Sequence, residues 1–278
     1  MRFAKGHGTG NDFIILPDPD DQLQLTGELV RRLCDRRTGI GGDGVLRIVA
    51  GADDSAPWFM DYRNADGGVA EMCGNGIRVF ARYLLDHGLA TGPELAIGTR
   101  AGVRTVRRES DGLFSVEMGP VKVGGPATAV IGGRSFDGLG VDVGNPHLVV
   151  IVSEPVIGFD LSQTPRVDAA EFPDGVNVEV VRPIGDLAVE MRVHERGSGE
   201  TLSCGTGAVA SAAAAASVAA GRRKGDDPLS TPASRWLVRV PGGTLTVTPG
   251  AAASVLTGPA VIVAEGEIST SWLGLSVS

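Results

Sequence analysis

The chain has 278 residues, of which 42% are hydrophobic and 21% are charged. This balance is too apolar for a disordered chain, and the length allows one large domain or two of ordinary size. The formal net charge of −8 comes from 25 basic and 33 acidic residues spread along the sequence, which argues against a nucleic-acid-binding protein. The one dense basic run, at 221–225, is short and precedes two aspartates, so we interpret it as a solvated loop.

The first twenty residues contain no apolar core of the kind found in signal peptides, and no window approaches the ~18 uninterrupted apolar residues of a membrane span. We therefore expect a cytoplasmic protein with no membrane partner. Its three cysteines are Cys34, Cys73 and Cys204, an odd number without a CxxC pair. This pattern is unlike a disulfide scaffold or a zinc cage, so we expect reduced thiols.

The predicted elements are mostly strands. Short β-rich runs between Gly, Pro and Asp turns occur, in chain order, at 12–16, 44–50, 113–118, 147–152, 176–182, 187–193, 236–240, 243–248 and 260–266. Helical patterns are fewer, at 26–37, 76–88 and 206–221. Runs of strands with few helices between them favour an α+β fold over a regular βαβ sheet.

Two of the helical segments begin with the same motif. The sequence Cys-Gly-x-Gly precedes both 76–88 and 206–221, and both segments are apolar nearly all round. We therefore expect each helix to be buried within its own sheet. The offset that relates the two cysteines also relates Gly74 to Gly205, Gly76 to Gly207, Met60 to Met191 and Gly68 to Gly199. This repetition predicts two duplicated half-molecules, related by a pseudo-two-fold axis, with the functional site between them.

A cysteine at a helix N-terminus has a particular chemistry. The unpaired N–H groups and the helix dipole favour its thiolate. Two such thiols suit the inversion of a carbon that bears hydrogen, because one thiolate removes the proton from one face while the opposed thiol returns a proton to the other. The N–H groups at 74–76 and 205–207 could hold a substrate carboxylate during this reaction.

A series of motifs along the chain resembles the diaminopimelate epimerase family, which interconverts LL- and meso-diaminopimelate on the bacterial lysine and cell-wall pathway. These motifs, in family order, are GNDF (10–13), GIGGDG (39–44), YRNADG (62–67), MCGNG (72–76), GNPH (144–147), GVNVE (175–179), HERGSGET (194–201), SCGTG (203–207), VPGG (240–243) and TGPA (257–260). The resemblance covers essentially the whole chain. One departure is Gly44, where many members have Gln.

The resemblance implies the roles of individual residues. Cys73 and Cys204 correspond to the catalytic acid and base. The substrate-binding residues implied are Asn11, Asn64, Asn145 and Asn177, the pair Glu195 and Arg196, and the backbone groups of Gly74, Asn75, Gly205 and Thr206. Arg196 could also hold a carboxylate through its planar guanidinium.

The resemblance also implies two pseudo-symmetric α+β domains, each a curved β-sheet or barrel around a central apolar helix. Their expected bounds are 1–118 with 265–278, and 119–264. No pyridoxal phosphate, other cofactor or metal is expected, since two thiols provide both proton transfers. The expected partner is the small-molecule substrate, and a homodimer is a possible assembly.

Three alternative functions fit these motifs less well. Proline racemases and hydroxyproline epimerases share the two-cysteine logic, but commonly have His where this chain has Asn75. A phosphate or nucleotide binder is disfavoured because GIGGDG matches neither common phosphate-loop spacing. A thiol redox protein would need a CxxC motif.

We expect Cys34 to be a buried core residue and Asp43 to be a turn residue. For His147 two readings stay open, because it could tune a nearby thiol or cap a strand.

Overall fold

The computed structural model describes residues 1–221 and 234–273, and the chain divides into two compact units. The first comprises Met1–Val116 with Pro259–Ser278, and the second comprises Glu117–Gly258. The chain returns to the first unit at Pro259, before the expected residue 265. The reason is that the strand Val261–Glu267 pairs with Arg2–Gly8 in the first unit. Apart from Gly221, the basic run at 221–225 lies outside the described residues.

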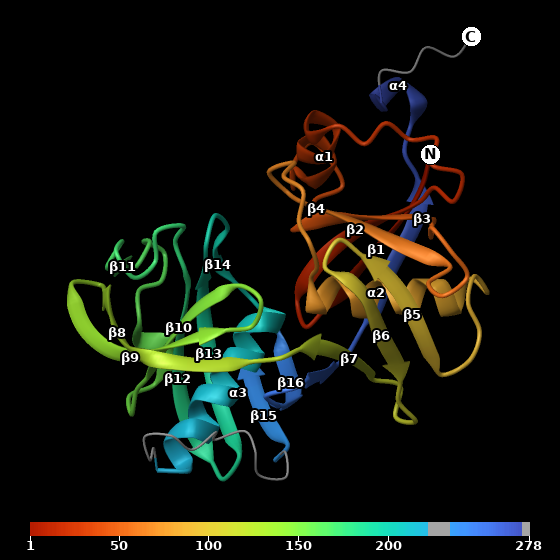
Figure 1. The fold of residues 1–278 in the computed structure, drawn as a ribbon. Coiled ribbons are helices and arrows are strands. Elements are labelled where there is room, and N and C mark those ends of the chain that lie inside the picture. Colours follow the sequence, from red (N-terminus) through yellow and green to blue (C-terminus); the bar gives the residue numbers. More distant parts are fainter. Residues whose placement is uncertain (222–233, 274–278) are drawn as a thin grey trace. The chain divides into compact units, whose positions relative to one another are not determined.

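The first unit is a strongly curved sheet around one long helix (Figure 1). Its elements are β1 (Arg2–Gly8), β2 (Asn11–Pro17), α1 (Gly27–Cys34), β3 (Gly44–Ala50), β4 (Trp58–Asn64), α2 (Gly74–Asp86), β5 (Glu94–Thr99), β6 (Gly102–Arg108), the start of β7 (Phe114–Gly119), β18 (Val261–Glu267) and α4 (Thr270–Leu273).

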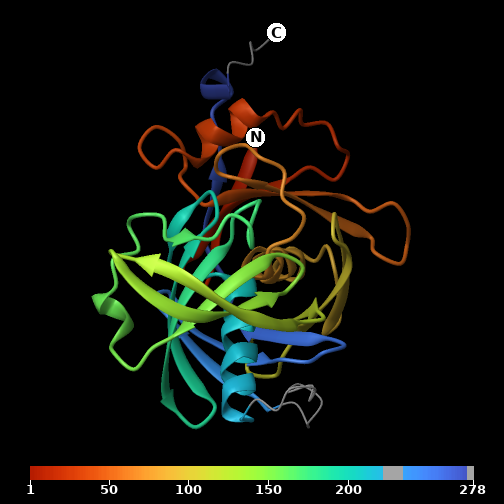
Figure 2. The same cartoon turned by 60° about the vertical axis from the view of Figure 1, so that its left-hand side comes forward.

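The second unit repeats this arrangement around its own long helix, which Figure 2 shows from the side with strands about it. Its elements are β8 (Lys122–Ile131), β9 (Arg134–Asp142), β10 (Pro146–Ile151), the short 3-10 helix η1 (Val156–Gly158), β11 (Arg166–Val167), β12 (Asn177–Gly185), β13 (Ala188–Glu195), β14 (Gly199–Thr201), α3 (Gly205–Ala219), β15 (Trp236–Val240), β16 (Gly243–Thr248) and β17 (Ser254–Gly258).

Strand pairing shows the duplication that the sequence predicts. In the first unit the order is β18-β1-β2-β3-β4-β5-β6-β7, and the β2–β3 and β4–β5 pairs are parallel. In the second unit the order β8-β9-β10-β12-β13-β15-β16-β17 has its parallel pairs, β10–β12 and β13–β15, at the same places. In each unit the long helix lies in the sequence between the two strands of the second parallel pair. The predicted two-domain α+β fold is therefore confirmed.

Both long helices begin at the first glycine of their motif, earlier than the predicted residues 76 and 206. Cys73 and Cys204 are the N-cap residues, and each sulfur accepts a hydrogen bond from the second glycine's N–H at 3.4 Å. Glycine lowers helix propensity in a helix interior, but in a capped first turn this bond compensates for it. The N-cap therefore decides where each helix starts.

The helices pack differently against their strands. In α2 the first turns are buried and the helix ends at the exposed Asp86. In α3 a run of alanines, Ala212–Ala215, is buried against strands on several sides. Small side chains let the surrounding backbones approach the helix closely, which is why this segment needs alanine rather than leucine.

The third predicted helix is shorter than expected. α1 ends at Cys34 instead of residue 37, because the Asp35 side chain accepts hydrogen bonds from the N–H groups of Arg37 and Thr38 and turns the chain. Cys34 is buried in a cluster with Leu33 and Ile14, as predicted. Within 1–221 and 234–273, no helix combines the length and apolar character needed to span a bilayer.

The packing of α3 predicts a clear difference between two substitutions in the same helix. Ala213 is fully buried, whereas Val218 is 52% exposed. Ala213→Leu should lower the free energy of unfolding by about 1–3 kcal/mol through overpacking, and Val218→Leu should leave it nearly unchanged. Chemical denaturation of both variants measures this, and equal stabilities would contradict close packing around α3.

Candidate active site

In the first unit, Cys73 lies where α2 begins, next to Asn11. Its backbone is extended, with φ −137°, and its half-buried side chain points into the helix start. The thiol donates to Asn11 Oδ1 at 3.7 Å, and the same oxygen accepts from Asn75 Nδ2 at 3.3 Å. Three of the predicted site residues therefore form one cluster within this unit.

Asp43 orients the Asn11 amide. Asn11 Nδ2 donates to Asp43 Oδ2 at 2.7 Å, so the opposite end of the amide, Oδ1, faces Cys73. Arg36 Nη2 in turn donates to the other Asp43 oxygen at 2.8 Å. The expectation that Asp43 is merely a turn residue was therefore incomplete, because its carboxylate also sets the direction of a predicted substrate-binding side chain.

Asn64 lies at the end of β4, directly opposite Gly44 on β3. A Cβ atom at position 44 would come within 2.5 Å of the Arg63 carbonyl oxygen. The close strand approach thus leaves no room for a side chain at position 44 in this chain. Asn64 remains half-buried at this strand end.

In the second unit, Cys204 lies at the start of α3 and is buried. Its sulfur is 3.4 Å from Thr206 Oγ1 and is hydrogen-bonded to Glu195. Burial raises the pKa of the Cys204 thiol well above its usual value, and the charges of Glu195 and Glu179 raise it further. In this surrounding the thiol form of Cys204 is favoured.

Glu195 is the carboxylate best placed to exchange a proton with Cys204. Burial raises the pKa of Glu195, while hydrogen bonds from Thr201 and Cys204 act in the opposite direction. Thr201 Oγ1 donates to Glu195 Oε1 at 2.5 Å. A carboxylate whose pKa is raised in this way is a stronger base toward a neighbouring thiol.

His147 belongs to a buried chain of hydrogen bonds that leads toward the same sulfur. Glu179 Oε1 lies 2.7 Å from His147 Nδ1, and His147 Nε2 lies 3.1 Å from Asn145 Oδ1. Asn145 Nδ2 donates to Thr206 Oγ1 at 3.4 Å. His147 therefore contacts Asn145 rather than Cys204 directly, and it also occupies a strand position.

The remaining predicted residues are Asn177, which begins β12, and Arg196, which directly follows β13. Asn177 Oδ1 accepts from the Arg196 backbone N–H at 2.8 Å. The Arg196 guanidinium donates to the Asp174 carbonyl at 2.9 Å, and the side chain is exposed. Asn177 and Arg196 are thus adjacent within the second unit.

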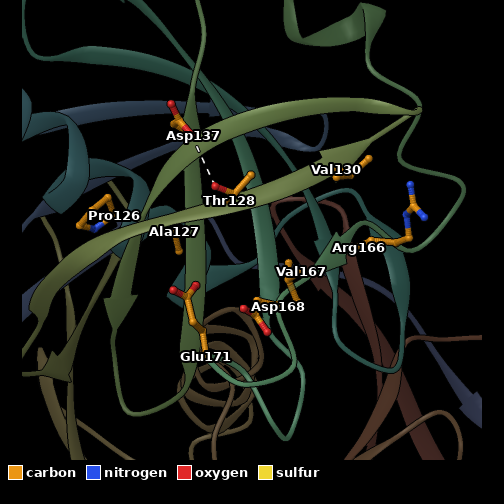
Figure 3. Close-up of a pocket in the computed structure, with 9 residues that line it drawn as sticks. All are labelled: Pro126, Ala127, Thr128, Val130, Asp137, Arg166, Val167, Asp168 and Glu171. Atoms are coloured by element: carbon orange, nitrogen blue, oxygen red, sulfur yellow. Dashed lines mark hydrogen bonds between the residues drawn. The ribbon is translucent and has the colours of Figure 1, made fainter.

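A separate groove of about 680 Å³ lies beside β8, β9 and β11 in the second unit. Figure 3 shows the Asp168 and Glu171 side chains near β8, and the Thr128 hydroxyl hydrogen-bonded to Asp137. None of the predicted site residues lines this groove.

Comparison with known proteins gives a consistent result. The family model described as diaminopimelate epimerase matches residues 3–124 and 140–263. The chain is 52% identical to the diaminopimelate epimerase of Thermobifida fusca, over 98% of this chain and all of that protein. It is 50% identical to those of Mycolicibacterium smegmatis, over 98% of both chains, and Streptomyces coelicolor, over 98% and 97%.

The chain belongs to the diaminopimelate epimerase family. Its fold is also shared by solved structures of low sequence identity. A phenazine biosynthesis protein of the PhzF family from Bacillus anthracis has 16% identity and a TM-score of 0.70, over 97% and 99% of the two chains. A hydroxyproline epimerase from Agrobacterium vitis has 18% identity and a TM-score of 0.65, over 96% and 91%.

The strand registers of this family member show which site residues correspond between the two units. Asn11 begins β2 and Asn145 immediately precedes β10, and each of these strands is the first of a parallel pair. Asn64 ends β4 and Glu195 ends β13, which are the matching strands of the two units. Asn75 and Thr206 are each two residues after their cysteine. The second unit therefore carries a carboxylate, Glu195, where the first carries an amide.

Gly207 provides a test of the hydrogen-bond chain. A Cβ atom there would lie 2.7 Å from Glu179 Oε1, which would have to leave His147. Gly207→Ala should lower the free energy of unfolding by about 1–3 kcal/mol and reduce epimerase turnover. The control is Gly158→Ala, because nothing lies within 4 Å of a Cβ there. Equal stability and turnover in both variants would contradict the close contact with Glu179.

Proposed function

We propose that the protein interconverts LL- and meso-diaminopimelate, with Cys73 and Cys204 as its acid–base pair. Family membership across most of the chain supports the substrate and the reaction. The observation that carries the assignment of the cysteines is their identical setting, because each caps the buried helix of one duplicated unit through its sulfur.

In the proposed reaction one cysteine, as thiolate, removes the α-proton and becomes a thiol. The other cysteine, as thiol, donates a proton to the opposite face of the carbanion and becomes a thiolate. The proton count is unchanged, and the cycle leaves the two sulfurs with exchanged protonation states. The reverse reaction starts from that exchanged state, so each cysteine serves as both acid and base.

The proposed substrate contacts use the groups around each sulfur. The first turns of α2 and α3, at Gly74–Asn75 and Gly205–Thr206, present N–H groups that helices do not use internally. Such groups stabilise the charge that grows on an α-carboxylate as its proton leaves. The other contacts are proposed for Asn11, Asn64, Asn145, Asn177, Glu195 and Arg196.

A homodimer and a cytoplasmic location stay predictions from the sequence. Similarity to a hydroxyproline epimerase, at 18% identity, shows the common fold alone. Free proline is therefore a control substrate rather than a second proposed one.

The proposed reaction has a direct test in deuterated water. Incubation of the pure protein with LL-diaminopimelate should give the meso isomer with deuterium at the inverted α-carbon, since the returned proton comes from a thiol that exchanges with solvent. Chiral chromatography with mass spectrometry measures both. Racemisation of L-proline without any meso-diaminopimelate would contradict the proposed substrate.

The two-cysteine mechanism predicts the effect of each thiol. Cys73→Ala and Cys204→Ala should each lower turnover about 10²–10⁴-fold or more in both directions, since an acid or a base is lost. Cys34→Ala should stay near wild type, because Cys34 packs in the core beside Leu33. Initial rates from both isomers measure this. Full turnover by either single-site variant would eliminate the two-base mechanism.

A further inference from the structure

Arg78 is a fully buried cation in the second turn of α2. Its guanidinium donates four hydrogen bonds, and every acceptor is neutral. The acceptors are Gly74 O at 3.1 Å, Asn75 Oδ1 at 2.9 Å, Thr9 Oγ1 at 3.0 Å and Pro259 O at 3.3 Å. Among the described residues no carboxylate forms an ion pair with it.

The other charged groups on elements packed against α2 are largely paired among themselves. Asp12 is paired with Lys5 and Arg36, Asp43 with Arg36, Asp61 with Arg47, Arg63 and Arg100, and Glu265 with His87, while His7 accepts from the Gly10 N–H. The carboxylates near α2 thus already have cations. A buried charge without a counter-ion is costly, so a negative partner at this place would be strongly stabilised.

The direction of the guanidinium indicates which partner it serves. Long side chains in a helix lean toward its N-terminus, and the bonds to Gly74 and Asn75 place the guanidinium along the first turn, which Cys73 caps. Burial lowers the pKa of Arg78 to about 10, while a charge on Cys73 acts to raise it. The guanidinium thus lies along the first turn of the helix whose N-terminus Cys73 caps.

The second unit has no such cation at the matching place. The offset that relates Cys73 to Cys204 relates Arg78 to Val209, a fully buried apolar residue. Besides burial, two acidic groups, Glu195 and Glu179, raise the pKa of Cys204 here, and the buried His147 imidazole faces this site through its contact with Glu179. Opposite local charges at the two helix starts favour opposite protonation states of the two sulfurs.

We propose that Arg78 is a positioning residue whose buried positive charge makes Cys73, and not Cys204, the thiolate of the resting enzyme. Arg78 also holds the Asn75 amide, whose Nδ2 donates to Asn11. The proposal rests on the proposed use of both cysteines in proton transfer. Thiol alkylation measures it in the absence of substrate, so failure of the diaminopimelate assay would not decide it.

The test is alkylation of the intact protein by iodoacetamide across a pH series, with each cysteine quantified by peptide mass spectrometry and normalised to its own plateau. In the wild type the midpoint for Cys73 should lie at least about one pH unit below that for Cys204, a tenfold difference in thiolate equilibrium. Arg78→Met should move the Cys73 midpoint upward by about one unit or more, and leave the Cys204 midpoint in place.

Two further variants separate charge from shape. Arg78→Lys keeps the charge and loses the planar fork, so its Cys73 midpoint should stay below that of Cys204. Arg82→Met, one turn further along α2, removes a half-buried cation paired with Asp86 and should not move either midpoint. It controls for the general effect of losing a cation from this helix.

Three results would overturn the proposal. They are a wild-type Cys204 midpoint at or below that of Cys73, an unchanged Cys73 midpoint in natively folded Arg78→Met, and an Arg78→Lys midpoint raised to that of Cys204. If Arg78→Met does not fold by circular dichroism, the wild-type order and the Arg78→Lys midpoint decide the question.

Discussion

The capping of a buried helix by a cysteine sulfur is the constraint on which the rest of each unit depends. The sulfur must accept an N–H from the helix and still face the reacting molecule, so the first turn cannot carry bulky side chains. Gly76 and Gly207 satisfy this, since a Cβ at either position would lie within 3.4 Å of the cysteine Cβ. The parallel strand pairs and the small residues of α3 then follow from wrapping a sheet around such a helix.

The duplicated units differ in the polar groups buried around that helix. Phe13 on β2 and His147 on β10 occupy the same register in their parallel pairs, next to Gly44 and Asn177. The first unit thus fills this position with an aromatic ring and buries Arg78 within the helix itself. The second unit fills it with an imidazole bonded to Glu179. A common backbone therefore gives two similar sulfurs different surroundings.

Much of this arrangement could be predicted from sequence, because helix caps and repeats are local or periodic signals. The cysteine at each helix N-terminus, the duplication and the burial of Cys34 were predicted in this way, although the two helices begin at Gly74 and Gly205 rather than at residues 76 and 206. The residues that orient the site were not, because the pairs Asn11–Asp43 and His147–Glu179 depend on strand register rather than spacing. Two of these buried residues, Glu179 and Arg78, could have been recognised from the sequence, because each is a single charged residue within an otherwise apolar run. The Gly-rich strand β8 lacked the β-branched alternation that reveals strands.

The position of β18 determines the order in which the chain can complete its folding during synthesis. The second unit is continuous in sequence, from Glu117 to Gly258, so all its strands have been synthesised before β18. In the first unit β1 pairs with β2 on one side and with β18 on the other, and the Met1 carbonyl accepts from the Ile268 N–H. One side of β1 can therefore pair early with β2, whereas its other side is completed only when β18 has been made, and until then that side is an open edge exposed to pairing with other chains.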